Sequence, residues 1–288
     1  MSVDLSLVLV SWNTRELLKS CLESVFRSLA QTPELTYEVF VADNASSDGS
    51  AEMVCREFPQ VKRIQTGANL GFAKANNLAL KEAQGRFWLL LNSDTLIPDE
   101  SRALAALVAV LDAHPEAAVA GPTLLNADGS LQVSWARFPG LASELSGALD
   151  RSQAPRALSE MERAEVRQTL APFTTDWVGG AAFLVRASAA QGKLFGLDEA
   201  FFMYAEETEW CLRLARAGHK TLFVPGIEIV HLGGGSSQAV PAATRQRMWR
   251  SSLRFYRLAS GWLGSLPACA VATARMALYP LKRRRLGS

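Results

Sequence analysis

Short apolar runs alternate with segments of helical periodicity through the first 121 residues of the chain. The runs are apolar at nearly every position, which is typical of strands buried on both faces of a parallel sheet. The intervening segments repeat apolar residues every three or four positions, as amphipathic helices do. This alternation predicts an α/β fold with a mostly parallel, doubly wound central sheet. The predicted strands are residues 5–10, 37–42, 61–65, 87–91 and 117–120, and the predicted helices are 15–29, a short one ending at 58, 72–83 and 99–113.

The pattern changes after residue 121. The pair Asp128-Gly129 predicts a hairpin turn, because it favours the positive φ angles of tight β-turns. Residues 141–170 have weak periodicity and are predicted to be helical or loosely ordered. The apolar segment 177–185 predicts one strand, and its two glycines indicate that another group approaches the backbone there. A helix over 206–217 and two short strands over 221–224 and 228–230 complete the predicted elements.

The strand at residues 87–91 runs directly into Asn92, Ser93 and Asp94. In open α/β sheets, ligands bind beyond the carboxyl ends of the strands. Asp94 offers a hard oxygen donor suited to Mg²⁺ or Mn²⁺. The alternative is a plain turn, because Asn, Ser and Asp side chains hydrogen-bond their own backbone. This stretch alone does not separate the two interpretations.

Asp43 ends the second predicted strand. In dinucleotide-binding folds an acidic residue at this place holds a ribose hydroxyl, but such folds need a glycine-rich turn after the first strand. Here that turn is Ser11-Trp12-Asn13, and the pair Gly67 and Gly71 has the wrong place and spacing. A nicotinamide enzyme is therefore disfavoured. Asp43 is either a partner of a base or ribose, or a cap of the following loop.

Three carboxylates open the helix predicted at residue 206. They complement the helix dipole, and Arg213 follows Glu209 at ion-pair spacing, so Glu209 is predicted to be structural. Glu206 and Glu207 are adjacent and disfavour each other's ionisation, which can raise a pKa into the range of a general base. His231 ends a strand before three glycines, where a phosphate or metal can approach the backbone, so a ligand role is favoured over a packing role.

Composition narrows the class of protein. The chain has 49% hydrophobic and 20% charged residues, which describes a globular protein, and its net charge of +2 makes no case for nucleic acid as a partner. The four cysteines have neither metal-type nor disulfide-type spacing, so each is predicted to be a small buried residue in a reducing compartment. Asp4 and the short apolar run after it do not fit a secretory signal, and we expect a cytoplasmic protein.

The tail from residue 245 onward alternates arginines with large apolar residues, which predicts a basic amphipathic helix. Residues 263–281 are mostly apolar but contain two prolines and one arginine, and a basic cluster follows at 282–285. A spanning helix would need about 20 cleaner apolar residues. A helix lying at an anionic membrane surface is favoured. A flap over the rest of the chain, or a dimer contact, remains the alternative.

Several motifs occur together in a characteristic order. They are VLVSWN (8–13), DNASSDGS (43–50), NLGFAKANN (69–77), LLNSD (90–94), GPTLLNADG (121–129), WVGGA (177–181) and FFMYAEETEWCLRLARAG (201–218). In combination they resemble the family 2 glycosyltransferases of GT-A type fold, and in particular their rhamnosyltransferase-like branch. The likeness extends from about residue 5 to about residue 237.

The resemblance implies a nucleotide-sugar site. Asp43 would hold the base, and the other nucleotide-binding residues would be Ser11, Asn13, Asn69, Gly71, Asn76, Asn92 and Ser93. Asn92-Ser93-Asp94 matches the family's Asp-x-Asp metal motif, with Asn92 departing from its first carboxylate. Asp94 and His231 would then hold Mn²⁺ or Mg²⁺.

The resemblance also implies a catalytic base and an acceptor-binding site. Glu207 falls where the family places its catalytic base, usually Asp in a Glu-Asp pair, and Glu206 is the substitute candidate. Trp177, Gly179 and Gly180 would line the acceptor.

The expected organisation is a GT-A catalytic domain over 1–240, with a nucleotide-binding half (1–121) and an acceptor-binding half (122–240), followed by a helical tail over 241–288. The expected function is metal-dependent, inverting sugar transfer in cell-wall polysaccharide synthesis. The donor would be a dTDP- or UDP-sugar, rhamnose first, and the acceptor a hydroxyl of a glycan or lipid-linked molecule at the inner face of the membrane. The alternative is an inactive relative that binds nucleotide or glycan, supported only by Asn92 and Glu207.

Overall fold

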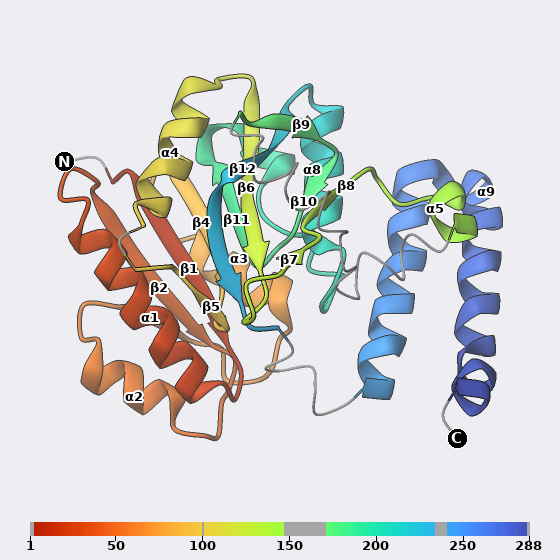
Figure 1. The fold of residues 1–288 in the computed structure, drawn as a ribbon, viewed down its shortest axis with the longest axis horizontal. Helices are drawn as coiled ribbons and strands as arrows, with labels where there is room; N and C mark the ends of the chain where they lie inside the picture. The colour runs from red at the N-terminus through yellow and green to blue at the C-terminus, as the bar shows by residue number, and fades with distance from the viewer. Residues whose placement is uncertain (1–2, 100, 147–170, 234–240, 287–288) are drawn as a thin grey trace.

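The computed structural model describes residues 3–99, 101–146, 171–233 and 241–286. These residues form a central sheet with helices on both faces, and a long helical hairpin stands beside it (Figure 1). The prediction of an α/β fold with a mostly parallel sheet and a C-terminal helical tail is confirmed.

The first half of the chain contains four parallel strands in the order β3-β2-β1-β4. They are β1 (Leu5–Ser11), β2 (Tyr37–Asp43), β3 (Lys62–Gln65) and β4 (Phe87–Asn92), joined by α1 (Arg15–Ala30), α2 (Ser50–Glu57) and α3 (Phe72–Leu80). Ser11 pairs with Asp43, and Val10 pairs with Asn92 on the other side. The carboxyl ends of β1, β2 and β4 therefore meet at one edge of the sheet, as the apolar runs and their polar ends predicted.

The second half adds strands of both directions. Strand β11 (Ala182–Arg186) lies antiparallel between β4 and β6 (Ala117–Leu125), and β6 pairs in parallel with β12 (Lys220–His231). Strand β5 (Thr95–Leu96) pairs antiparallel with β12, which brings His231 opposite Thr95. The remaining elements are α4 (Ala103–Ala113), β7 (Leu131–Gln132), β8 (Trp135–Ala136), α5 (Leu141–Ser146), β9 (Phe173–Thr175), β10 (Trp177–Val178), η1 (Ala187–Ala189), η2 (Gly192–Leu194), α8 (Glu206–Arg216) and α9 (Pro241–Leu286).

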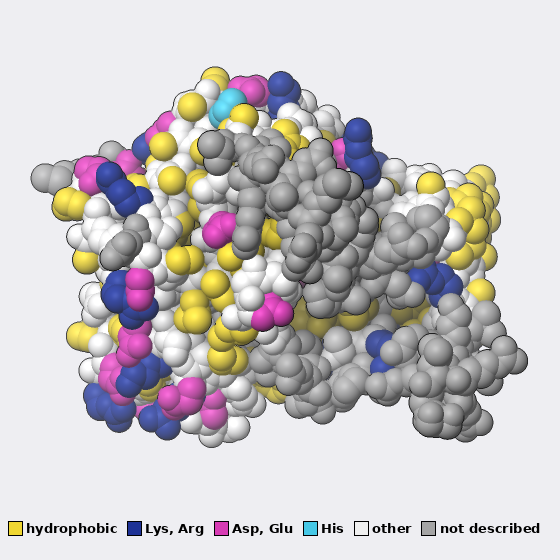
Figure 2. Space-filling model, in the orientation of Figure 1, with side chains coloured by type: hydrophobic (Ala, Val, Ile, Leu, Met, Phe, Trp, Pro, Cys, Tyr) yellow, Lys and Arg dark blue, Asp and Glu magenta, His cyan; other side chains and the backbone are white. Residues whose placement is uncertain are grey.

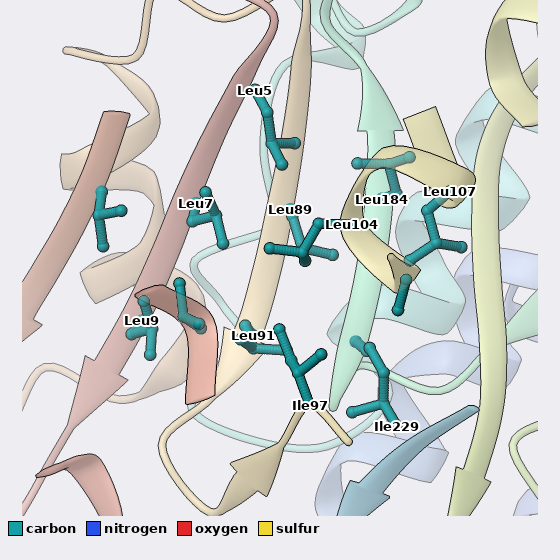
Figure 3. Packing of buried hydrophobic residues seen from close by; sticks show 14 of the residues in the cluster. Leu5, Leu7, Leu9, Leu89, Leu91, Ile97, Leu104, Leu107, Leu184 and Ile229 are labelled. Carbon is teal, nitrogen blue, oxygen red and sulfur yellow. The ribbon is translucent and has the colours of Figure 1, made fainter. Parts of the chain in front are cut away.

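The core occupies both faces of the sheet, which explains why the strands are apolar at successive positions. On one face, alternate leucines of β1 and β4 belong to a cluster that also includes Leu104 and Leu107 of α4 (Figure 3). On the other face, Val8 and Leu90 join a second cluster that includes Trp210 of α8. The residues that Figure 3 shows on the first face include Leu5, Leu7, Leu9, Leu89, Leu91, Leu104 and Leu107.

Segment 177–185 is not the single strand that was predicted. It forms β10 and β11 with Gly179–Ala181 between them, and β10 pairs with β8 in a separate small sheet. The backbone N–H of Gly179 donates to the Ser134 carbonyl (2.7 Å), which diverts the chain from the main sheet. Val178 fills the space beside Gly121, where an added Cβ would lie 2.6 Å from the valine Cβ.

The two predicted strands at 221–230 form one strand, β12, with an irregular register between Val224 and Glu228. Pro225 lies at that point, and it has no N–H to donate to a ladder. The expected burial is confirmed for Cys21 and Cys211, but it is wrong for Cys55, which is exposed on α2, and Cys269 is only partly buried. The predicted hairpin turn is confirmed by the antiparallel pairing of β6 with β7. Most of the segment 141–170 lies outside the described residues.

The tail is a hairpin of two helical halves, broken at Gly261 (φ 72°, ψ 176°). Phe255 and Tyr256 of its first half are buried against Phe201 and Leu212. Within the ranges given above, no helix has the length and apolar content needed to cross a membrane.

Candidate functional site

A pocket of about 380 Å³ lies at the sheet edge where β1 and β4 end, next to the start of α8. Four of the fifteen predicted site residues, Ser11, Asn13, Asp43 and Asn76, are not in its wall. The eleven that line it are Asn69, Gly71, Asn92, Ser93, Asp94, Trp177, Gly179, Gly180, Glu206, Glu207 and His231.

Asp43 lies at the end of β2 with only 8% of its surface exposed. Its Oδ2 accepts the backbone N–H of Ser46 (3.1 Å). Its Oδ1 is buried and has no hydrogen-bond partner in the described parts of the chain. A buried acceptor without a partner is costly, so Asp43 is suited to receive a donor from a ligand, such as an N–H of a base.

Ser11, Asn13 and Asn76 form hydrogen bonds within the protein. The Ser11 hydroxyl is 3.0 Å from the Thr14 hydroxyl, and Thr14 reaches Ser93 at 3.0 Å. Asn13 Oδ1 accepts a backbone N–H from the loop after β2 (2.8 Å), and Asn76 donates to a backbone carbonyl of its own helix (2.9 Å). These three residues shape the loops, and Trp12, between two of them, lines the pocket.

Gly71 joins the loop before α3 to the segment before α8. Its φ is +83°, and an added Cβ would lie 2.4 Å from the Phe202 carbonyl oxygen. Its carbonyl accepts from the Asn44 side chain (3.2 Å), which also donates to Asn69 Oδ1 (3.1 Å). Glycine is required here by both the conformation and the close approach.

Asp94 and His231 are far apart in the sequence and meet in the pocket. The β5–β12 pairing places His231 Nε2 3.3 Å from Asp94 Oδ1. The same nitrogen lies 3.3 Å from Asn92 Nδ2. The Leu232 N–H donates to the Asp94 carbonyl (2.9 Å) and fixes this junction.

Gln132, on β7, sets the orientation of the His231 ring. Its amide nitrogen donates to the His231 carbonyl (2.6 Å) and to Asn126 Oδ1 (2.7 Å). Its amide oxygen therefore faces His231 Nδ1 at 2.8 Å. Because that oxygen only accepts, Nδ1 carries a proton, and in the neutral ring the lone pair is on Nε2, beside Asp94.

Asp94 and His231 fit a divalent cation that is shared with a ligand. The pair offers one carboxylate oxygen and one imidazole nitrogen, donors that Mn²⁺ accepts in proteins. In the ranges that the structure covers, no group of three or more His, Cys, Asp or Glu could enclose a metal ion. Mg²⁺ is commonly bound by one or two carboxylates together with phosphates and water. The donor set is therefore suited to a cation completed by phosphate oxygens.

Two residues in the left-handed conformation lead into α8. Tyr204 has φ 76° and Ala205 has φ 66°, which is uncommon for residues that carry a Cβ and is often found at functional sites. Glu206 and Glu207 follow at once and line the pocket. As predicted, Glu209 faces away and forms an ion pair with Arg213 (2.8 Å).

Burial makes Glu206 and Glu207 unusually weak acids. Burial, followed by the charge of Glu207, raises the pKa of Glu206 well above its ordinary value. Burial raises the pKa of Glu207 to about 7. A carboxylate with a pKa near neutrality is suited to act as a general base at physiological pH.

Gly180 lies directly beside Glu207. An added Cβ would be 3.5 Å from Glu207 Cγ, so the glycine leaves open space next to the carboxylate. Trp177 lines the same wall, and its indole N–H donates to the Arg137 carbonyl (3.1 Å). Gly180 and Trp177 therefore form the side of the pocket next to Glu207.

The sequence did not reveal several residues of the pocket. Gln132 is one, because its partner His231 is 99 positions away, and its only signal is its place in the predicted hairpin. Thr244, Arg247 and Phe255 of α9 also line the pocket. Their contribution depends on how the tail folds back, which no local pattern encodes.

The sequence matches the family described as Glycosyl transferase family 2 over residues 6–187. It is 30% identical to an N-acetylglucosaminyl-diphospho-decaprenol L-rhamnosyltransferase of Mycobacterium tuberculosis (strain ATCC 25618 / H37Rv), over 92% of this chain and 92% of that protein. It is 23% identical to the rhamnosyltransferase WbbL of Escherichia coli (strain K12), over 78% of this chain and 82% of that protein.

The fold is similar to that of the mannosyltransferase PcManGT from Pyrobaculum calidifontis, solved in complex with GDP-Man and Mn²⁺. The TM-score is 0.61 at 17% sequence identity, and the match covers 100% of this chain and 77% of that one. The fold is thus of GT-A type, as the resemblance predicted. Because the family match covers more than half of its residues, the chain belongs to glycosyl transferase family 2.

Proposed function

We propose that the protein is a metal-dependent, inverting glycosyltransferase that moves rhamnose from a dTDP- or UDP-linked donor to a hydroxyl of a lipid-linked glycan. The curated relatives, which carry rhamnosyltransferase names, support the sugar and the acceptor class. The observation that carries the proposal is that one pocket holds both Glu207, with a pKa of about 7, and the Asp94–His231 pair.

The donor's nucleoside is proposed to bind at the edge formed by β1 and β2. The unpartnered Oδ1 of Asp43 supports this placement, because a pyrimidine base presents an N–H donor of matching chemistry. Trp12 and Asn69, which line the pocket beside it, would complete the nucleoside site. The diphosphate then extends toward Asp94.

Asp94 and His231 would hold Mn²⁺ or Mg²⁺ next to the diphosphate. When bound, such a cation neutralises the charge that develops on the departing diphosphate. Asn92, which replaces a carboxylate in the family's motif, still lies 3.3 Å from the His231 ring.

Glu207 is proposed to take the proton from the acceptor hydroxyl as that oxygen attacks the anomeric carbon. Attack from the side opposite the diphosphate forms the new glycosidic bond as the old one breaks. A single displacement of this kind inverts the anomeric configuration. Glu206, buried beside Glu207, is proposed to set the charge of the pair.

The acceptor is proposed to enter along Trp177, Gly179 and Gly180. A relative's name specifies a diphospho-decaprenol carrier, so a lipid-linked acceptor at the inner face of the cell membrane is the natural substrate class. The α9 tail is proposed to contact that membrane.

Calorimetric titration of the full chain with dTDP, UDP, GDP and NADH, each with and without Mn²⁺, tests the donor site. We expect metal-dependent binding of dTDP or UDP that is lost in Asp94→Ala and kept in the surface control Glu23→Gln. Metal-independent binding would favour an inactive relative that only binds nucleotide. Binding of NADH alone, or of no nucleotide, would overturn the proposal.

A further inference from the structure

The second half of α9 turns an apolar face to solvent. Trp262 is 68% exposed, Leu263 75% and Leu266 47%, and Leu258 is also exposed just before the break at Gly261. These side chains are close together in sequence around the bend of the hairpin. Figure 2 shows hydrophobic side chains gathered at the outer edge of the molecule, where Figure 1 places α9.

The charged side chain in this part of the helix is mostly buried and points inward. Arg275, the one charged residue between Trp262 and Ala277, donates to the Glu144 carboxylate (3.0 Å) and to the Glu144 carbonyl (3.2 Å). Glu144 is buried and also accepts the Tyr256 hydroxyl (2.6 Å). An ordinary surface helix faces its apolar stripe toward the core and its charges toward water. In this half of α9 the small residues Ala268 and Ala272 are buried, but the charge of Arg275 also faces the protein and the large apolar side chains face water.

Between Pro267 and Ala277, where the structure describes the side chains, the outer face of this helix carries no charge. Moving away from Leu266, the exposed positions of this helix are small or apolar, with one threonine. They are Pro267, Ala270, Thr273, Ala274 and Ala277.

Charge is distributed very unevenly between the tail and the rest of the chain. Ten of the 30 lysine and arginine residues lie in residues 241–286, and none of the 28 aspartate and glutamate residues does. The tail therefore carries a formal charge of +10, and residues 1–240 carry −8. Arg250 and Arg257 are exposed on the first half of α9, on the helix surface that leads to Leu258.

The same helix borders the pocket. Thr244, Arg247 and Phe255 line it, and the Arg247 guanidinium lies over the Phe202 ring at 4.8 Å. A surface bound through α9 would therefore lie next to the proposed acceptor entrance.

We infer that α9 is a peripheral membrane anchor whose hairpin lies flat on an anionic lipid bilayer, with Trp262, Leu263 and Leu266 inserted at the acyl boundary. Arg250 and Arg257 then contact lipid headgroups. The inference rests on the proposed function, because an anchor of this kind would bring the pocket next to a lipid-linked acceptor. Amphipathic helices with aromatic and basic residues bind bilayers in this orientation. Pairing of this face with the same face of a second copy is disfavoured, since it would bring two strongly positive tails together.

Flotation of the full chain with lipid vesicles tests the anchor. We expect binding to phosphatidylcholine vesicles that contain phosphatidylglycerol, weak binding to phosphatidylcholine alone, and loss of binding at high salt. The triple variant Trp262→Ser, Leu263→Ser, Leu266→Ser is expected to lower the partition coefficient by more than about tenfold. The control Tyr37→Ser removes an exposed aromatic residue on β2 and should leave it unchanged.

A double variant that removes two basic side chains tests the headgroup contacts. Each basic residue at a membrane surface contributes about fivefold to binding, so Arg250→Gln with Arg257→Gln should lower the partition coefficient by about thirtyfold. The control Arg63→Gln with Lys81→Gln removes two exposed charges elsewhere and should have no effect.

The anchor would be overturned if the wild type bound neutral and anionic vesicles equally, or if the triple variant bound vesicles as well as the wild type. It would also be overturned if the wild type formed a concentration-dependent dimer that the triple variant could not form. Transfer to a short-chain, water-soluble acceptor separates this inference from the proposed function. The triple variant should keep that activity. If the wild type binds vesicles as expected but transfers no sugar, only the proposed function fails.

Discussion

His231 Nδ1 lies 2.8 Å from the amide oxygen of Gln132, and this contact leaves the Nε2 lone pair directed at Asp94. Partners of this kind, one shell away from a metal, fix ring orientation and tautomer. The hairpin formed by β6 and β7 thus orients a residue of the proposed cation site without providing a ligand.

Gln132→Leu is expected to weaken Mn²⁺ binding by about 10- to 100-fold in the presence of dTDP, because the His231 ring loses its orienting partner. Electron paramagnetic resonance of free Mn²⁺ measures this. The chain has three histidines, so nitrogen NMR of histidine-labelled, metal-free protein can also report the tautomer directly. The wild type should show a proton on Nδ1 of His231. Gln60→Leu, on the surface, is the matched control, and unchanged Mn²⁺ affinity in Gln132→Leu would contradict this role.

The pH dependence of transfer follows from Glu207. Its pKa of about 7 means that the carboxylate is the minority form below neutrality. Because a general base must be deprotonated, kcat/KM is expected to rise with pH and to level off above about pH 7. Steady-state rates across neutral pH measure this. A flat profile would argue against Glu207 as the base.

Glu206 is expected to destabilise the folded state at high pH. Its raised pKa means that the folded state binds the proton more tightly than the unfolded chain, so the free energy of unfolding falls as pH rises above 4.5. Glu206→Gln removes this buried charge and should raise the melting temperature well above pH 7, by roughly 2–4 °C for each kcal/mol recovered. Near pH 4.5 the change should vanish. Thermal unfolding at both pH values tests this, and a lower melting temperature for the variant at high pH would contradict it.

Gly71 and Gly67 form a natural pair for testing the junction with Phe202. Both have positive φ, but an added Cβ meets Phe202 only at Gly71, and nothing lies within 4 Å at Gly67. Both alanine variants incur backbone strain of about 1 kcal/mol. Gly71→Ala should lose a further 1–3 kcal/mol or so from overpacking. Urea unfolding compares them, and equal losses would show that the Phe202 contact is unimportant.

The sheet and part of the site could be predicted because both depend on local pattern. Uniformly apolar runs gave the strands, and the polar residues that end them, such as Asp43 and Asp94, lie at the predicted edge. Contacts over long sequence separations could not be predicted. Gln132 reaches His231 across 99 residues, and Arg275 reaches Glu144 across 131.

The tail shows the same limit. Its periodicity predicted an amphipathic helix, but not which face would turn inward. The orientation of the helix depends on Glu144, which accepts a hydrogen bond from Arg275 on the inner face. Trp262 and its apolar neighbours are then exposed to solvent.

The decisive measurement is transfer from dTDP-rhamnose to N-acetylglucosaminyl diphosphate on a short prenyl chain, with NMR of the product. We expect Mn²⁺- or Mg²⁺-dependent transfer with inverted anomeric configuration. Glu207→Gln should lower kcat by about 100- to 10,000-fold, and Glu23→Gln should not change it. A product with retained configuration, or full activity in Glu207→Gln, would contradict the account.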